Sequence, residues 1–477
     1  MTIRSKEPII EGVNLEKGDQ VSAYKTIKKN RLGTDNIKNL ILAFAIPAII
    51  SNLVSSLYNI IDQIFIGQAV GMLGNAATNV TFPLTTVVVG ISLLIGIGSA
   101  SNFNLEMGRQ NEEKAKKFIG NGITYLVIAG VLLTIITLIY LEPLVLLFGA
   151  TENVLPYALT YTRVTALGFP FMVMIIGGGQ FIRSDGSPKY AMFTTLTGAI
   201  INIFLNPIFI FTFNLGIAGA AMATIVGQGI SAFLIFRYFK NFNTVTLEKS
   251  DFIPSPIFLK AIVALGAASA LNQMALALVQ TVMNNTLSHY GALSQYGADI
   301  PLAVVGIITK VNTLYYGLLI GIAQGTQPIY GYNYGAQDYK RVKETLFMAI
   351  KTVVGIGIVT FGAFQIFPRQ IISIFGKGNE LYYDFGVRYL RIFLFFTIFN
   401  GIQLITSSFF TAIGKSSRGI FLSLTRQVIF LLPLMIILPR LFGIDGVVFS
   451  GPIADFAALA LSVIFISNEV RLLNKLS

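Results

Sequence analysis

The chain has 477 residues, of which 54% are hydrophobic and only 12% are charged, and its mean hydropathy is +0.71. A soluble globular domain carries about 25% charged residues, so this composition excludes an ordinary soluble fold. The formal net charge is +12, and the chain contains one histidine and no cysteine. Disulfide bonds and thiolate chemistry are therefore excluded, and a zinc-type metal site has too few ligands.

The first residues, 1–36, are polar and mixed in charge, without the apolar segment and cleavage site of a signal peptide. Twelve apolar segments follow, each long enough to cross a bilayer as a helix. They span about 38–66, 77–105, 117–140, 157–182, 189–213, 217–239, 257–289, 300–330, 343–367, 383–411, 418–438 and 446–469. We therefore predict an all-α integral membrane protein with twelve transmembrane helices.

Residues 98–116 return 227 positions later as residues 325–343. A repeat of nearly half the chain predicts two structural halves, and six spans in each half give both the same orientation. We expect two six-helix lobes related by a pseudo-two-fold axis along the membrane normal. The predicted organisation is an N-terminal tail (1–37), an N-lobe (38–245), a linker (246–256), a C-lobe (257–470) and a C-terminal tail (471–477).

Most of the 34 Lys and Arg residues lie in the N-terminal tail or in alternate loops, whereas the opposite loops hold only Arg369, Lys377 and Arg440. The positive-inside rule then predicts that both termini are cytoplasmic, in a multi-pass protein of the plasma (inner) membrane. Because the basic residues serve as orientation signals and no nucleic-acid-binding module is present, we expect no nucleic-acid partner.

Polar residues inside apolar spans are the candidates for function, because they are costly in a bilayer. Asp62 is the clearest of them. Ser51, Ser55 and Asn59 precede it at helical spacing, which predicts one polar stripe on the first span. Pro47 removes a backbone hydrogen bond from the same helix and predicts a bend or hinge.

The fourth and fifth spans carry four amide or hydroxyl residues that extend this polar surface. Thr195, Asn202 and Asn206 fall on one helical face, with Pro207 immediately after them, and Gln180 follows three glycines in the fourth span. One such amide usually serves helix packing. Together with Asp62 they predict a hydrated, anionic pocket in the N-lobe.

The C-lobe candidates are different in charge. Gln280 and Asn284 in the seventh span and Asn400 in the tenth are neutral, Lys310 in the eighth is a cation, and Asp455 in the twelfth is an anion. Whether Lys310 and Asp455 pair is not readable from the sequence.

Sequence motifs for catalysis are few. His289, the single histidine, lies near the end of the seventh span, and no GxxxxGK[ST] phosphate loop occurs. We therefore predict that the protein is not an enzyme and needs no cofactor.

The chain resembles MATE (multidrug and toxin extrusion) transporters, nearer the DinF-like and MepA-like branches than the NorM-like branch. The resemblance covers roughly residues 38–470. It rests on PAIISNLVSSLYNIIDQIFIG in the first span, FIRSDGSPKYAM after the fourth, NIFLNP in the fifth and QGTQPIYGYNYGAQDYKRVK closing the eighth.

The resemblance implies two lobes that form a V and export organic cations against an inward H⁺ or Na⁺ gradient. Asp62 corresponds to the first-helix carboxylate that such members protonate, and Pro47 to the proline where that helix bends. Asn202 matches a pocket asparagine and Gln180 lies at or beside another. Asn206 departs from the pattern, since many relatives have aspartate there, and the C-lobe lacks the acids of NorM-like members.

We therefore expect an antiporter for small cationic or amphipathic compounds, acting as a monomer in the lipid bilayer. Asp62 would be the coupling group for H⁺ or Na⁺, and Na⁺ near Asp62 would be its only metal ion. The alternative is a flippase of lipid-linked sugars or cell-wall precursors, for which Lys310 and three arginines in apolar spans, Arg163, Arg388 and Arg391, would need to face a cavity. A membrane-embedded enzyme and a passive channel are further alternatives.

Overall fold

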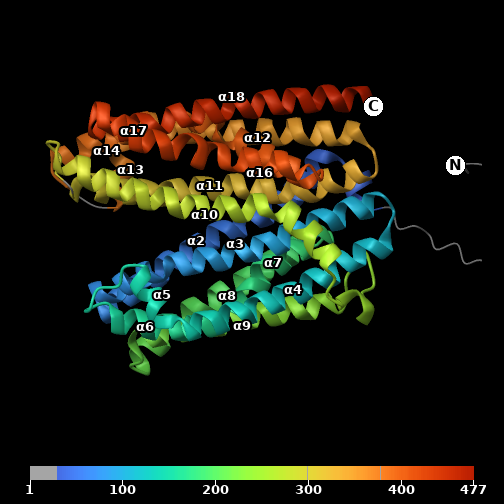
Figure 1. Ribbon diagram of the computed structural model, residues 1–477, viewed down its shortest axis with the longest axis horizontal. Coiled ribbons are helices and arrows are strands. Elements are labelled where there is room, and N and C mark those ends of the chain that lie inside the picture. Colours follow the sequence, from blue (N-terminus) through green and yellow to red (C-terminus); the bar gives the residue numbers. More distant parts are fainter. Residues whose placement is uncertain (1–29, 298, 376–377, 477) are drawn as a thin grey trace, which may run out of the picture.

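The computed structural model describes residues 30–297, 299–375 and 378–476, which are helical almost throughout and contain no strand in these ranges (Figure 1). The helices of the N-terminal half are α1 (Arg31–Thr34), α2 (Ile37–Val70), α3 (Met72–Gly108), α4 (Glu112–Ile139), α5 (Leu141–Leu147), α6 (Leu155–Leu167), α7 (Phe169–Ser184), α8 (Pro188–Pro207), the π-helix η1 (Ile208–Thr212) and α9 (Gly216–Phe239). Those that follow are the 3-10 helix η2 (Lys249–Phe252), α10 (Pro256–Ala292), α11 (Asp299–Gly335), α12 (Tyr339–Ile366), α13 (Pro368–Phe375), α14 (Glu380–Phe393), α15 (Thr397–Ala412), α16 (Ser416–Leu424), the π-helix η3 (Thr425–Leu431), α17 (Leu432–Phe442) and α18 (Ile444–Leu476).

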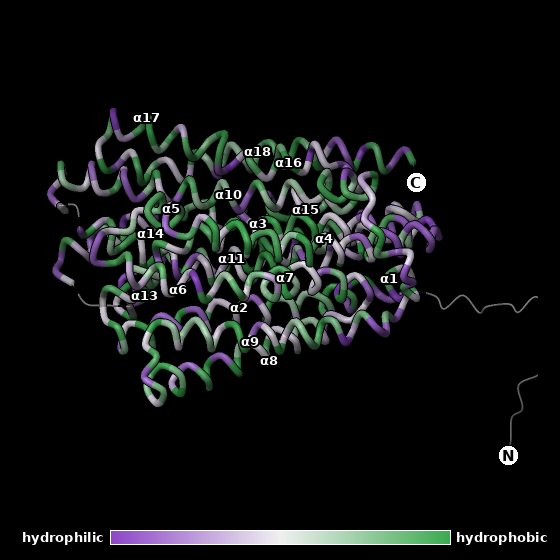
Figure 2. Tube along the Cα trace, turned by 60° about the horizontal axis from the view of Figure 1, so that its bottom comes forward, coloured by the Kyte–Doolittle hydropathy of each residue, from purple (hydrophilic) through white to green (hydrophobic). Residues whose placement is uncertain are grey.

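Ten continuous helices in the described ranges are long and apolar enough to cross a membrane. Two bent pairs raise the number to twelve: α6 and α7 meet at 53°, and α14 and α15 meet at 50°. These pairs coincide with the predicted spans at 157–182 and 383–411, so the expected twelve-helix membrane fold is confirmed. Figure 2 shows hydrophobic residues along the middle of the helices and hydrophilic residues gathered at both ends of the molecule.

The internal repeat is visible in backbone detail. Gln110 and Gln337, which are 227 residues apart, both adopt the left-handed conformation with φ of 61°. The residue after each of them, Asn111 or Asp338, caps the next helix by accepting a hydrogen bond from a backbone N–H three residues on. The bent pairs recur at the same spacing. Both halves therefore use the same local structure to connect equivalent helices.

Four long helices form the contact between the halves: α3 packs on α10, and α2 packs on α11. Figure 1 shows α4–α9 on one side of these four helices and α12–α18 on the other. Between α3 and α10, a Cβ added at Gly98 would lie 2.0 Å from the Ile262 carbonyl oxygen. One added at Gly266 would lie 1.8 Å from the Leu94 carbonyl oxygen. Glycine is required where two membrane helices approach this closely.

The second pair of helices makes the symmetric contact. Gly321 and Gly325 of α11 touch the backbone of Ile49 and Ala45 of α2, on either side of Pro47. Pro47 is buried and α2 continues through it as one helix. The predicted hinge segment is therefore held against the other half of the molecule.

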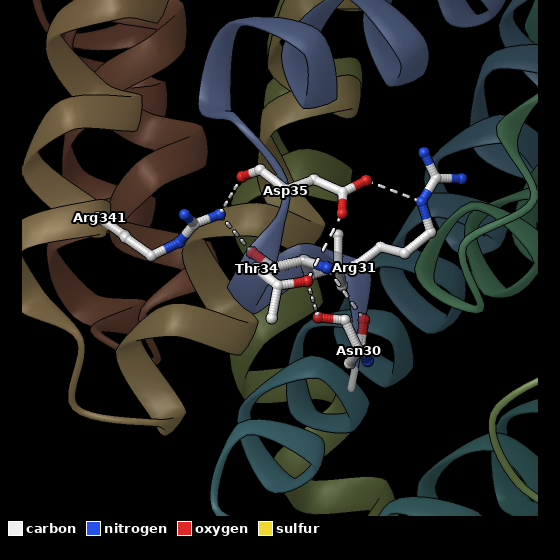
Figure 3. A network of polar contacts seen from close by, with 6 residues as sticks. Asn30, Arg31, Thr34, Asp35 and Arg341 are labelled. Carbon is white, nitrogen blue, oxygen red and sulfur yellow. Dashed lines mark hydrogen bonds and ion pairs between the residues drawn. The ribbon is translucent and has the colours of Figure 1, made fainter. Parts of the chain in front are cut away.

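Arg341 of α12 holds α1 against the rest of the molecule (Figure 3). Its guanidinium donates to the carbonyl oxygens of Leu32 at 3.1 Å and Asp35 at 2.7 Å. On α1 itself, Arg31 forms an ion pair with Asp35 at 2.8 Å. Close to Arg341, Lys343 of α12 donates to Asn474 of α18 at 2.7 Å, so α1 and the C-terminal end of α18 lie at the same end of the molecule.

The segment predicted as the linker between the lobes is hydrogen-bonded to α4. The predicted linker contains η2, where Asn121 of α4 donates to the Asp251 carbonyl at 3.0 Å and accepts from the Ser255 backbone N–H. Helix α18 runs to Leu476, so the segment predicted as a C-terminal tail continues the last helix. Of the predicted N-terminal tail, residues 1–29 lie outside the described residues.

We predict that Gly266→Ala destabilises the protein by about 1–3 kcal/mol, because the new methyl group overlaps a carbonyl oxygen of α3. Gly355→Ala is the matched control, since a Cβ there meets nothing within 4 Å. It should be neutral or stabilising by up to about 1 kcal/mol. Thermal unfolding in detergent measures both, and equal stability of the two variants would contradict the glycine contact.

Candidate functional site

Asp62 lies at the centre of a hydrogen-bonded network in the N-lobe. Its side chain is buried, with 8% of the residue exposed, and it accepts a 2.8 Å hydrogen bond from the Asn206 amide of α8. The same amide nitrogen donates to Asn202 at 3.1 Å, and Asn202 donates to Thr224 of α9 at 3.0 Å. The structure thus connects α2, α8 and α9 through one carboxylate, two amides and one hydroxyl.

Local sequence explains how Asn206 comes to face Asp62. Asn202 and Asn206 are one helical turn apart, so both point from the same face of α8 toward α2 and α9. Pro207 follows, and the backbone continues as the π-helix η1. The Oδ1 atom of Asn206 is buried and has no hydrogen-bond partner in the described structure. One acceptor oxygen beside Asp62 is therefore unused.

Two tyrosines complete the surroundings of Asp62. Tyr58 on α2 and Tyr161 on α6 both interact electrostatically with its carboxylate. Neither they nor Thr224 were predicted, because a tyrosine or threonine in an apolar span is common and carries no signal by itself. No Lys or Arg of the described residues forms an ion pair with Asp62.

The other predicted N-lobe residues lie outside this network. Ser55 and Asn59, on the same helix as Asp62, line a separate cavity, and Asn59 donates to the Ser55 carbonyl. The Thr195 hydroxyl donates only to the Ala191 carbonyl of its own helix. Gln180 is buried on α7 and makes no side-chain hydrogen bond in the described structure. The hydrogen-bonded network is thus smaller than the pocket expected from sequence.

The cavity has a volume of about 560 Å³ and lies mainly in the C-lobe. Its walls come from α2, α3, α10, α11, α14, α15, α16 and η3. Volumes of this order hold drug-sized ligands in proteins. Asp62 is not among the lining residues, so the carboxylate network and the cavity are two sites that share helix α2.

The C-lobe candidates lie in different places. Gln280 lines the cavity and donates to Asn284 at 3.0 Å, whereas Asn400 is buried away from it. Lys310 is exposed on α11 and does not line the cavity. Asp455 is buried and pairs with Arg426 of η3, with Oδ1 and Nε 2.5 Å apart. Asp455 therefore does not pair with Lys310.

The arginines that the flippase alternative needs do not line the cavity either. Arg163 is exposed, Arg388 pairs with Asp445 at 2.8 Å, and Arg391 donates to the Gln365 carbonyl at 3.1 Å. His289 is exposed on α10. Among the described residues, no group of three or more His, Cys, Asp or Glu side chains is placed to hold a metal ion.

Comparison with known proteins identifies the family. The MatE family profile matches residues 47–208 and 268–437, one segment in each half of the chain. The chain belongs to the MatE family. Members of this family are transporters rather than enzymes, which confirms both the resemblance and the expectation that the protein is not an enzyme.

Curated MatE relatives align along nearly the whole chain. Multidrug export protein MepA of Staphylococcus saprophyticus is 27% identical over 423 residues, covering 88% of this chain and 92% of that protein. MepA of Staphylococcus aureus is 26% identical over 424 residues, with the same coverage of both chains.

Solved structures share the fold. An outward-facing multidrug resistance MATE transporter of the MOP superfamily is 24% identical, with a TM-score of 0.87, and the match covers 94% of this chain and 100% of that one. A MOP superfamily transporter from Pyrococcus furiosus is also 24% identical, with a TM-score of 0.86, covering 93% of this chain and 98% of that one.

We predict that Asn206→Ala destabilises the protein by about 1–3 kcal/mol, because Asp62 loses its donor while it remains buried. The cost should be smaller in an Asp62→Asn background, where the unpaired group is neutral. Thr195→Val, on the same helix, is the control and should stay within about 0.5 kcal/mol. A double-mutant cycle of thermal unfolding measures the difference, and an equal cost in both backgrounds would contradict the Asp62–Asn206 interaction.

Proposed function

We propose that this MatE protein is a secondary active antiporter that exports lipophilic, often cationic compounds in exchange for H⁺ or Na⁺. It would do so as a monomer in the plasma membrane, with both termini cytoplasmic. Family membership and relatives that are named multidrug export proteins support the substrate class. The single observation that carries the coupling mechanism is the environment of Asp62.

Asp62 is a carboxylate held in an apolar helix by one neutral donor. An ionised carboxylate costs several kcal/mol inside a membrane unless it is paired, so such residues mark proton or ion sites. A permanent ion pair would have fixed its charge, but its nearest hydrogen-bonding partner is the Asn206 amide. A proton or Na⁺ bound at Asp62 would therefore neutralise a charge that nothing else in the network neutralises.

Asn206 limits how much charge this site can exchange. An amide contributes an oxygen dipole but no charge, so the network holds one ionisable acid rather than two. The unused Asn206 Oδ1 and the Asp62 carboxylate are the oxygens that a Na⁺ ion would use. We propose that one monovalent cation is exchanged at this site in each cycle.

Helix α2 provides the link between ion and substrate. Ser55 and Asn59 line the cavity, and Asp62 follows within one turn further along the same helix, beyond the cavity wall. A change in the position of α2 would therefore alter both sites together. Each bound species needs only to favour a different conformation to drive exchange. Bending of α2 at Pro47 would provide that movement.

The contacts between the lobes suit one state of this cycle. The glycine contacts of α3 with α10 and of α2 with α11 lie in the halves of these helices nearest the described termini. With cytoplasmic termini, they would close the path on the cytoplasmic side. The flippase alternative receives less support, because the arginines that it needs, Arg163, Arg388 and Arg391, do not line the cavity.

We predict that Asp62→Asn reduces uphill export of a cationic dye from proteoliposomes to the level of empty vesicles. The substitution keeps the size of the side chain but removes the group that exchanges a cation. Asp299→Asn is the control, since Asp299 is an exposed carboxylate at the start of α11 and its loss should leave export unchanged.

Imposing a pH gradient and a Na⁺ gradient separately identifies the coupling ion. Undiminished gradient-driven export by Asp62→Asn would remove Asp62 from the mechanism. Dye movement that never exceeds equilibrium in the unmodified protein would instead indicate a passive channel.

A further inference from the structure

The cavity in the C-lobe is lined by a single charged residue among the described residues, Arg426. Arg426 lies on η3, ten residues after α16 begins, and thus roughly 15 Å along the helix from that end. This is about half the thickness of a hydrocarbon core. A charge at that depth is costly and tends to mark a substrate or ion pathway.

The protein occupies only one of the three guanidinium nitrogens of Arg426 with a hydrogen bond. Its Nε donates to Asp455 Oδ1 on α18, at 2.5 Å, and this is its only hydrogen bond in the described structure. The two Nη atoms make none, and they are not among the buried polar atoms that are shut off from solvent. Since Arg426 lines the cavity, its Nη edge is the part of the guanidinium that is open to it.

Asp455 gives this arrangement a direction. Its side chain is fully buried behind Arg426 and its second oxygen, Oδ2, has no partner. The ion pair therefore presents its positive end to the cavity and keeps its negative end in the protein. A bare cation is repelled at this wall, whereas a carboxylate can accept two parallel hydrogen bonds from the Nη edge.

We infer that the C-lobe cavity contains a subsite at Arg426 for the carboxylate of an amphipathic aromatic compound. This inference rests on the proposed function only in assuming that the cavity receives the exported compounds. It adds to the lipophilic cations a second kind of substrate, zwitterions that carry a cationic aromatic ring system and a carboxylate.

The surroundings of Arg426 suit the rest of such a molecule. Tyr316, Tyr389 and Phe393 line the same cavity and offer aromatic surfaces to a flat ring system. Tyr389 is held by a hydrogen bond to Met283, also in the wall. Aromatic faces attract a cationic ring, so the two ends of a zwitterion would meet complementary surfaces.

A purely structural role for the Arg426–Asp455 ion pair predicts a different result. If Arg426 and Asp455 only fastened η3 to α18, their replacement would change stability without changing which ligand is preferred. A ligand pair that differs only in the carboxylate separates the two roles. Rhodamine 110 has a free carboxylate, and rhodamine 123 is its methyl ester with the same cationic ring.

The experiment measures binding of both dyes to the purified protein in detergent by fluorescence anisotropy. We expect rhodamine 110 to bind at least about tenfold more tightly than rhodamine 123, the ratio that one charge-assisted hydrogen bond would already provide. The double variant Arg426→Gln/Asp455→Asn removes both charges together and avoids leaving Asp455 unpaired. It should bind the two dyes equally and bind rhodamine 123 as the unmodified protein does.

The single variant Arg426→Lys keeps the charge but loses the planar fork, so it should retain only part of the preference. Equal or weaker binding of rhodamine 110 by the unmodified protein would overturn the inference. So would a preference that survives in the double variant, or the absence of binding by either dye.

The Asp62→Asn variant keeps this test separate from the proposed antiport. It should lose gradient-driven export but retain the tighter binding of rhodamine 110, because Asp62 does not line the cavity. If the unmodified protein exports dye normally but binds the two rhodamines equally, only the carboxylate subsite is contradicted. If Asp62→Asn binds rhodamine 110 more tightly and its export is undiminished, only the coupling role of Asp62 is contradicted.

Discussion

A carboxylate buried in an apolar environment with one neutral hydrogen-bond donor is the constraint on which this account depends. In a water-filled site, Asp62 would be solvated on all sides, and a basic partner would neutralise its charge permanently. The Asn206 amide does neither, since it stabilises the anion without neutralising it. The free energy of the site therefore depends on whether a cation is bound, which is the property that an ion-coupled transporter needs.

The second requirement is a movable connection between that site and the substrate cavity. Glycines at 98, 266, 321 and 325 let helices of the two halves meet backbone to backbone. Such an interface is held by close packing rather than by ion pairs, so it can separate without exposing unpaired charges to lipid. Because α2 takes part in the interface, the cavity and the Asp62 network, its position affects all three.

The spans, the repeat and the family were readable from the sequence because each depends on local pattern. Hydropathy locates each span to within a few residues, and a shared 227-residue spacing becomes shared backbone geometry at Gln110 and Gln337. Helical periodicity grouped Asn202 with Asn206 correctly. It could not separate Asp62, which turns toward α8, from Ser55 and Asn59, which face the cavity.

Contacts between distant spans account for what the sequence left open. Lys310 drew attention as a cation inside a span, yet it is exposed on α11. Arg426 was missed, since nothing in the sequence of its span indicates that Asp455 of the next span lies at the same depth. Depth and rotation of a helix are set by packing against its neighbours, and a single chain read in order does not contain them.

The most direct test of the central claim is infrared difference spectroscopy of the purified protein as a transported dye is added. If Asp62 exchanges its cation for substrate, the spectrum shows a change in one carboxyl group: loss of a protonated carboxyl band with H⁺, or a Na⁺-dependent shift of a carboxylate band. That change must be absent in Asp62→Asn. Identical difference spectra in both proteins, with the dye bound in each, would contradict it.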